Sequence, residues 1–292
     1  MRTVTTRLEL REALAGRRSE NATIGFVPTM GALHEGHLSL LEAARRDCDC
    51  VVMSLFVNPA QFGPGEDLAR YPRDLESDAA KAADAGVDLL YAPPVDEVYP
   101  PGFSTSVEVE GLTDVLCGDP KSRGRAHFRG VTTVVAKLFN TVGPDVAYFG
   151  QKDAQQAAVI HRMARDLDYP VRIEVMPTIR EADGLAMSSR NAYLEPAERE
   201  RAASLNRALS AARDAAVPEG LVEPSLAAAG RVLEQAGIEP EYLEARSAED
   251  LAPVESFNGR PVLIAVAARL GGARLIDNVL IDSTSASGGK AH

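Results

Sequence analysis

The first 177 residues alternate short runs of β-branched apolar residues with longer segments whose apolar positions recur at helical spacing. Five runs have the length and composition of buried strands, at residues 23–27, 51–57, 88–91, 145–149 and 171–176. Four other segments have helical periodicity, at 36–46, 74–86, 131–142 and 154–167; Asp74 is the N-cap candidate of the second, and Gly143 ends the third. This alternation of strand and helix predicts a parallel sheet with helices on both faces.

The pattern changes after Pro177. Two Ala-rich segments at 196–215 and 223–236 predict helices, and strand-like segments follow at 241–246, 262–268 and 274–281. We therefore expect an α/β domain over residues 1–177 and a smaller α+β domain over residues 178–282. Residues 283–292, STSASGGKAH, have the small and polar composition of a disordered tail.

Composition and charge limit the partners that the chain can bind. With 45% hydrophobic and 25% charged residues the sequence is typical of a soluble globular protein, and its formal net charge is −11. Nucleic acids and anionic membranes attract basic surfaces, so neither is an expected partner.

Three cysteines without regular spacing do not predict a disulfide framework. The absence of an N-terminal apolar signal, and of any apolar run near the roughly 18 residues of a membrane helix, predicts a cytoplasmic protein.

Four of the expected strands are followed by clusters of amide, imidazole and cationic side chains. The clusters are PTMGALHEGH from Pro28, NPAQF from Asn58, GQKDAQQ from Gly150, and PTIR from Pro177 leading to MSSR from Met187. Ligands of open α/β sheets bind outside the carboxyl ends of the strands. The sequence therefore predicts one site to which all four clusters contribute.

The first cluster is the most specific of the four. His34 and His37 flank Gly36 at a strand-to-helix junction, where backbone N–H groups and positive partial charge favour phosphate. Two imidazoles can donate to phosphate oxygens, and Gly36 allows a nucleotide to approach the backbone. No GxxxxGK[ST] loop is present, so the pattern does not predict a P-loop ATPase. The structural alternative is that both histidines are surface or capping residues.

Zinc binding is a second alternative for this region. His34, His37, Cys48 and Cys50 are ligand types that zinc uses. The cysteines, however, fall near the far end of the helix that starts beside the histidines. A helix of about ten residues is about 15 Å long, so we expect the two pairs to lie too far apart for one ion.

The later clusters offer further phosphate ligands. Lys152 starts a helix and can bind phosphate, while Asp153 either caps that helix or accepts a hydrogen bond from a ribose hydroxyl. Ser188, Ser189 and Arg190 supply two hydroxyls and a guanidinium suited to a polyphosphate. A polar turn between domains has the same composition and is the alternative.

Neutral amides supply the remaining candidates. Asn58, Gln61 and Gln156 can hold a small polyhydroxy acid without protonating it, or can stabilise loops instead. A basic stretch is either a solvated loop or a lid attracted to polyphosphate, and we favour the solvated loop for most of its side chains. It comprises Lys121, Arg123, Arg125, His127 and Arg129.

Taken together, the blocks resemble the pantothenate synthetase family, within the nucleotidyltransferases that share an HxGH block. PTMGALHEGH, FVNPAQF, FGQKDAQQ and ADGLAMSSRN resemble its four hallmark blocks, in family order, and AHFRGVTTVVAKLFN and RLIDN resemble two more. The resemblance covers residues 22–282. It implies a Rossmann-like domain, a smaller C-terminal lid domain and a homodimer formed through the N-terminal domain. It also implies ATP-dependent condensation of (R)-pantoate with β-alanine to pantothenate, AMP and pyrophosphate through a pantoyl-adenylate.

The resemblance further implies roles for individual residues. ATP contacts fall to Met30, Gly31, Ala32, Leu33, His34, Glu35, Gly36, His37, Gly150, Gln151, Lys152, Asp153, Ile179, Met187, Ser188, Ser189 and Arg190. His37 is the residue that the family uses as proton donor, and His34, Lys152 and Arg190 are the other catalytic candidates. Pantoate contacts fall to Gln61, Gln156 and Asn58, and Gln61 also contacts β-alanine. His127 and Tyr71 are supporting contacts.

One departure from the family pattern concerns magnesium. Some relatives carry an acidic pair in the helix after YPR, where this chain has a single Asp78 and then Lys81. We therefore expect no metal held by the protein itself, and Mg²⁺ carried on the ATP phosphates with water.

Two other functions share parts of the pattern. A nucleotidyltransferase could transfer AMP to a phosphorylated acceptor and keep the adenylylated product, but the FVNPAQF block offers neutral amides rather than cations for such an acceptor. A nucleotide-sensing module could bind ATP without consuming it, but two histidines and three accompanying polar clusters exceed what binding alone requires.

Overall fold

The computed structural model describes residues 1–282, which divide into two compact units. Unit 1 comprises Met1–Asp114, Gly118–Gln151 and Val159–Pro177. Unit 2 comprises Val115–Cys117, Lys152–Ala158 and the chain from Thr178 onward. The domain boundaries expected at residues 177 and 282 stay predictions, and the expected tail at 283–292 lies outside the described residues.

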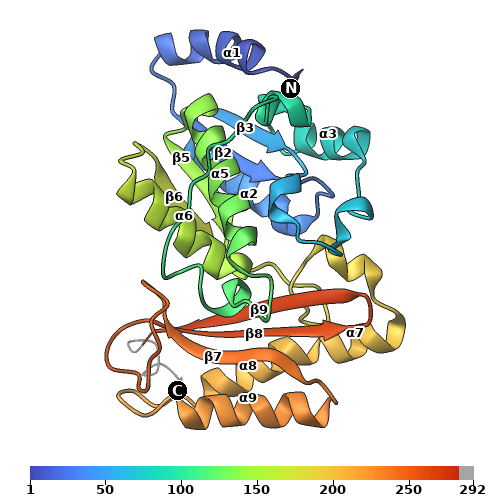
Figure 1. Ribbon diagram of the computed structural model, residues 1–292, viewed down its shortest axis with the longest axis vertical. Coiled ribbons are helices and arrows are strands. Elements are labelled where there is room, and N and C mark those ends of the chain that lie inside the picture. Colours follow the sequence, from blue (N-terminus) through green and yellow to red (C-terminus); the bar gives the residue numbers. More distant parts are fainter. Residues whose placement is uncertain (283–292) are drawn as a thin grey trace, which may run out of the picture. The chain divides into compact units, whose positions relative to one another are not determined.

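Unit 1 is built on a six-stranded sheet with the strand order β1-β4-β3-β2-β5-β6 (Figure 1). The strands are β1 (Arg2–Val4), β2 (Ile24–Thr29), β3 (Cys50–Leu55), β4 (Leu89–Tyr91), β5 (Val146–Gly150) and β6 (Arg172–Met176). Every neighbouring pair is parallel. The parallel sheet that the sequence predicts is confirmed.

Helices connect the strands and cover the sheet. They are α1 (Arg7–Ser19), α2 (Glu35–Asp47), α3 (Leu75–Asp84), α4 (Val95–Val98), α5 (Arg125–Val142) and α6 (Ala154–Asp166), with 3₁₀ turns η1 (Pro59–Gln61), η2 (Asp67–Ala69), η3 (Leu116–Gly118) and η4 (Gln151–Asp153). Helix α1 contacts α5, and α2 contacts α3. Right-handed crossovers place these two pairs on opposite faces of the sheet. One core cluster joins Leu41 of α2 and Ala82 of α3 to Met53 of β3.

Local signals located some helix ends correctly and missed others. Asp74 caps α3 by accepting from the Ser77 N–H at 3.0 Å, and Gly143 ends α5 in the left-handed region at φ 58°, both as expected. Strand β1 and helix α1 are additional to the predicted elements, because β1 has three residues and α1 buries only Leu10 and Leu14 in a charged segment. Helix α5 begins at Arg125, six residues before its expected start, because its first turn is polar.

Unit 2 contains a three-stranded antiparallel sheet, order β7-β8-β9, covered by helices (Figure 1). The elements are β7 (Pro240–Ser247), β8 (Val262–Leu270), β9 (Ala273–Ile281), α7 (Pro196–Ala202), α8 (Ser204–Asp214), α9 (Glu223–Gln235) and the 3₁₀ helix η5 (Ser189–Tyr193). The segment expected to form one helix over 196–215 is two helices that meet at Ala203. Leu209, Leu233 and Ile264 lie in one buried core between helices and sheet. The expected α+β organisation is confirmed.

Candidate active site

Four adjacent strands of unit 1 end in the polar clusters that the sequence predicts. In the order β3-β2-β5-β6, each strand pairs in parallel with the next, so their carboxyl ends lie along one edge of the sheet. The chain continues from β2 toward β3 and from β5 toward β6, so its direction reverses between β2 and β5. Open α/β sheets bind ligands at such a reversal. The clusters after β2 and β5 therefore start on either side of the expected ligand position.

The loop after β2 places two histidines at the start of α2. His34 caps the helix, and its Nδ1 accepts from the Gly36 N–H at 3.2 Å. His37 Nδ1 accepts from the His34 N–H at 3.4 Å. A neutral imidazole that accepts at Nδ1 carries its proton on Nε2. The ring centroids are 4.1 Å apart and the planes are tilted by 40°, so two Nε2–H donors belong to one compact group.

His34 and His37 cap α2, as the structural alternative predicts, but capping does not exclude a role of the same two residues in phosphate binding. The capping bonds use Nδ1 of each ring, whereas donation to a ligand uses Nε2. The capping bonds also fix which nitrogen carries the proton, as a hydrogen bond at one ring nitrogen does generally. His34 and His37 can therefore cap α2 and donate to an anion at its N-terminus.

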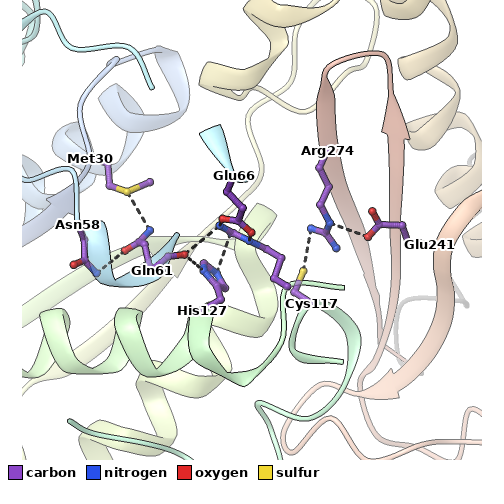
Figure 2. Close-up of polar contacts among 9 residues, drawn as sticks. Met30, Asn58, Gln61, Glu66, Cys117, His127, Glu241 and Arg274 are labelled. Atoms are coloured by element: carbon purple, nitrogen blue, oxygen red, sulfur yellow. Dashed lines mark hydrogen bonds and ion pairs between the residues drawn. The ribbon is translucent and has the colours of Figure 1, made fainter. Parts of the chain in front are cut away.

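Asn58 and Gln61 form a buried pair of amides after β3 (Figure 2). Asn58 Nδ2 donates to Gln61 Oε1 and to the Gly130 carbonyl, both at 3.0 Å. Asn58 Oδ1 accepts from the Ala60 N–H at 3.2 Å and from the Tyr99 hydroxyl at 2.8 Å. Asn58 is 1% exposed and its two donor and two acceptor positions are all used within the protein. In this arrangement it orients Gln61.

Gln61 keeps a donor that a substrate can claim. Its Nε2 donates to Met30 Sδ at 3.0 Å (Figure 2). A thioether sulfur is a weak acceptor. A carboxylate or hydroxyl oxygen of a substrate would be a stronger acceptor. A substrate oxygen can therefore replace the Met30 sulfur as the hydrogen-bond partner of the Gln61 Nε2 group.

Part of the predicted basic stretch holds the main chain of Gln61 (Figure 2). His127 Nδ1 lies 2.8 Å from the Gln61 carbonyl oxygen, which can only accept, and His127 Nε2 lies 3.1 Å from Arg123 Nη1. Arg123 Nε also donates to Glu66 at 2.9 Å. Because Arg123 and His127 are mostly buried, the solvated-loop interpretation is wrong for these two residues. Desolvation raises the pKa of Glu66, but the hydrogen bond and charge of Arg123, with smaller contributions, lower it overall.

The cluster after β5 begins at Gly150 and passes through η4 into α6. In unit 2, Lys152 Nζ lies 3.5 Å from Asp153 Oδ1, and the Lys152 carbonyl accepts from Asn278 Nδ2 of β9 at 3.0 Å. Gln155 is buried: its Oε1 accepts from the Cys117 N–H at 3.0 Å and its Nε2 donates to the Val115 carbonyl at 2.7 Å. These bonds give Gln155 a structural role, whereas Gln156 is half-buried.

A tight turn brings the last cluster together within unit 2. Arg180 forms an antiparallel bridge with Ala186, and the Met187 N–H donates to the Ile179 carbonyl at 3.0 Å. Ile179 and Met187, both predicted ATP contacts, are therefore neighbours. Ser188 caps η5 by accepting from the Arg190 N–H at 3.3 Å.

An ion pair anchors this turn to β9. Arg180 Nη1 lies 2.6 Å from Asp277 Oδ2, and Arg180 Nη2 lies 3.0 Å from Asp277 Oδ1. Asp277 is 2% exposed. Asn278, the next residue, binds the Lys152 carbonyl, so consecutive residues of β9 hold two predicted ATP-binding segments.

Neither the zinc alternative nor a disulfide has a counterpart in the described chain. Residues 1–282 contain no group of three or more His, Cys, Asp or Glu side chains that could hold a metal ion. Cys48, Cys50 and Cys117 are unbridged and buried. Burial raises the pKa of the Cys48 and Cys50 thiols. No helix in the same residues has the length and apolarity needed to span a membrane.

A family model described as Pantoate-beta-alanine ligase matches residues 2–280. The chain belongs to the pantoate–β-alanine ligase family. The pantothenate synthetase of Moorella thermoacetica is 53% identical over 281 residues, covering 94% of this chain and 96% of that protein. The family resemblance of the sequence blocks is thus confirmed, and the chain is a ligase of pantothenate biosynthesis.

Solved structures of the same family share the fold. Pantothenate synthetase from Thermus thermophilus has a TM-score of 0.88 and 51% identity, covering 96% of this chain and 99% of that one. The ligase from Francisella tularensis, complexed with β-γ ATP and β-alanine, has a TM-score of 0.77 and 32% identity, covering 96% and 97%.

Several residues of the site's framework were outside the predicted set, Tyr99, Asp277 and Asn278 among them. Tyr99 completes the hydrogen bonding of Asn58, and Asp277 and Asn278 hold the segments of Arg180 and Lys152. The RLIDN block that contains Asp277 and Asn278 was recognisable in the sequence, but its partners were not. Tyr99 carries no local signal, because it lies 41 residues from Asn58.

Proposed function

We propose that this chain condenses (R)-pantoate with β-alanine at the expense of ATP, through a pantoyl-adenylate, and releases AMP and pyrophosphate. The observation that carries the proposal is the order of the strand ends: the amides after β3, the histidines after β2 and the Gly150 loop after β5 follow three adjacent parallel strands. An acid-binding group therefore stands beside an anion-binding group.

The first half-reaction is an in-line displacement. A pantoate carboxylate oxygen attacks the α-phosphorus of ATP, the bond to the bridging oxygen breaks, and pyrophosphate leaves with that electron pair. In this proposal the Nε2–H groups of His34 and His37 donate to phosphate oxygens, and His37 is the proton donor. Lys152 and Arg190 neutralise phosphate charge. These residues work by positioning and electrostatics, which are the largest contributions in reactions of this kind.

The second half-reaction joins the amine. The uncharged β-alanine amine attacks the acyl carbonyl, AMP leaves with the carboxylate oxygen, and the amine loses a proton as the amide forms. Gln61 contacts pantoate and β-alanine, and Gln156 contacts pantoate. Asn58 contributes by orienting Gln61. No protein nucleophile is needed.

The nucleotide is proposed to contact the remaining predicted residues of each cluster. In unit 1 these are Met30–Leu33, Glu35, Gly36, Gly150 and Gln151, and in unit 2 they are Asp153, Ile179 and Met187–Ser189. Mg²⁺ enters as part of the substrate, on the ATP phosphates and water, as is usual for this ion.

The oligomeric state is also a proposal. We expect a homodimer through the N-terminal domain, in the cytoplasm. Strand β6 is at the edge of the sheet, where a strand offers main-chain groups to a partner, and Val175 on it is 39% exposed. Light scattering of the purified protein should give twice the chain mass, and a monomer at micromolar concentration would remove this part of the proposal.

The adenylate is tested by following oxygen. Pantoate labelled with ¹⁸O in its carboxylate should transfer one labelled oxygen to AMP when ATP and β-alanine are present. AMP and pantothenate should form in equal amounts, and omission of β-alanine should stop their turnover. Label in phosphate or pyrophosphate, or a stable adenylylated product in place of AMP, would refute the proposed reaction.

A further inference from the structure

Asp78 is a buried carboxylate to which the proposed reaction assigns no role. It lies on α3 and is 2% exposed. Its Oδ2 accepts from the Ala32 N–H at 2.8 Å and its Oδ1 accepts from the Leu33 N–H at 2.7 Å. One carboxylate thus binds two successive main-chain amides of the segment that leads into His34.

The bound segment has a costly backbone conformation. Gly31 and Ala32 have φ angles of 86° and 53°, and the left-handed region is unfavourable for a residue with a Cβ such as Ala32. A Cβ on Gly31 would lie 2.8 Å from Asp78 Oδ2, so glycine permits both the turn and the approach of the carboxylate. Hydrogen bonds to a charged acceptor are stronger than neutral ones and offset the cost of the turn.

A second side chain of α3 holds the same segment. Lys81 Nζ donates to the Leu33 carbonyl at 2.9 Å, so both main-chain polar groups of Leu33 are bound from α3. Leu33 is the last residue before His34, so these two bonds fix the direction in which the chain enters His34. An ammonium that binds the same residue as Asp78 also opposes a divalent cation at that carboxylate, because like charges repel.

We infer that Asp78, assisted by Lys81, is the positioning residue that orients His34 and His37 toward the nucleotide. A shift of the turn at 31–33 would move the His34 ring and also the His34 N–H on which His37 Nδ1 depends. Both rings would therefore be misplaced by one change. The inference rests on the proposed function, in which these two rings donate to ATP phosphates.

Asp78→Asn is the test variant because it keeps the shape of the side chain. It replaces one acceptor oxygen with an NH₂ group that faces a main-chain N–H, so one amide loses its acceptor. We expect kcat to fall at least about tenfold, since small misplacements of catalytic groups are costly. The half-saturating Mg²⁺ concentration should stay unchanged. Hydrogen–deuterium exchange of the peptide containing residues 31–34 should become faster.

Asp84→Asn is the matched control, because Asp84 is an exposed acid on the same helix. It should leave kcat, the Mg²⁺ dependence and the exchange rate unchanged. Lys81→Met is a second variant, and because Lys81 is exposed we expect the variant to fold. Loss of the hydrogen bond from Lys81 to the Leu33 carbonyl should lower kcat about threefold. This variant carries the test if Asp78→Asn does not fold, and wild-type kcat with wild-type exchange in Lys81→Met would then overturn the inference.

Three outcomes separate the inference from its rivals. Wild-type kcat in folded Asp78→Asn would overturn it. Recovery of kcat at high Mg²⁺ concentration would overturn it in favour of a metal ligand. If the wild-type protein itself has no turnover, the proposed function fails, whereas the exchange measurement still decides whether Asp78 holds the segment.

Discussion

Gly130 on α5 packs against the segment that carries Gln61, a proposed pantoate contact. A single methyl group added at Gly130 should therefore impair the use of pantoate and leave the binding of ATP almost unchanged. A Cβ built there would lie 2.2 Å from the Ala60 carbonyl oxygen and 2.7 Å from the Gln61 nitrogen. Cβ atoms essentially never come within 3.0 Å of non-bonded atoms, so Gly130→Ala requires a shift of at least 0.8 Å, the difference between 3.0 Å and 2.2 Å. The shift moves η1 away from α5 and stretches the bond from Asn58 Nδ2 to the Gly130 carbonyl.

The magnitude follows from these contacts. Overpacking of a tight interface costs about 1–3 kcal/mol, the weakened hydrogen bond adds about 1 kcal/mol, and alanine recovers about 1 kcal/mol of helix propensity. We expect a net loss of about 1–3 kcal/mol in the free energy of unfolding. Because an error near 1 Å in a substrate-positioning group can cost about 100-fold, kcat/KM for pantoate should fall by that order. The KM for ATP should change little.

The assay is steady-state pantothenate formation with pantoate and ATP varied separately, beside urea unfolding. Gly16→Ala is the matched control: Gly16 lies on α1 of the same unit, and a Cβ there meets nothing within 4 Å. It should stabilise the protein by about 0.5–1 kcal/mol and leave both KM values unchanged. Wild-type kcat/KM for pantoate in Gly130→Ala would refute the reasoning, as would a rise in the KM for ATP as large as the rise in the KM for pantoate.

Three further predictions concern charge and pH. His37→Ala and Lys152→Ala should each lower kcat about 100-fold or more without loss of folding, as judged by circular dichroism, and near-normal turnover in both would contradict their assignment. Asp277→Asn should lower the free energy of unfolding by about 2–3 kcal/mol, because it breaks a buried ion pair whose arginine is partly exposed. Asp214→Asn is the control: Asp214 forms an exposed ion pair with Arg213, so its effect on the free energy of unfolding should be near zero. Burial raises the pKa of Tyr91 and Tyr99 to about 12. The tyrosine hydroxyls therefore ionise at lower pH in the unfolded chain than in the folded one, so the free energy of unfolding should fall as pH rises from about 10 toward 12. The fall should be less steep in Tyr91→Phe. A constant urea midpoint over that pH range would contradict this prediction.

Much of the fold could be predicted because it depends on local periodicity. The strands β2 to β6 and the cap residues Asp74 and Gly143 follow from neighbouring residues alone. The placement of the four polar clusters along one edge of the sheet also followed, since parallel strands point the same way. The break at Ala203 and the early start of α5 were missed because polar or Ala-rich residues fit several structures equally well.

The framework around the site could not be predicted, because it depends on contacts between distant residues. Asp78 is 46 residues from Ala32, Asn58 is 72 residues from Gly130, and Lys152 is 126 residues from Asn278. No periodicity connects such pairs. They meet only where packing of helices on the sheet closes the intervening loops.

Residue type and local spacing are enough to identify the chemical groups that this protein offers and the strand that each of them follows. What each group does there depends on the folded chain. Folding made His34 and His37 cap α2 through Nδ1, buried Asn58 behind Gln61 and turned Asp78 toward main-chain amides. A polar side chain takes its role from the partners that burial brings within hydrogen-bonding distance, and those partners are set by the packing of the whole unit.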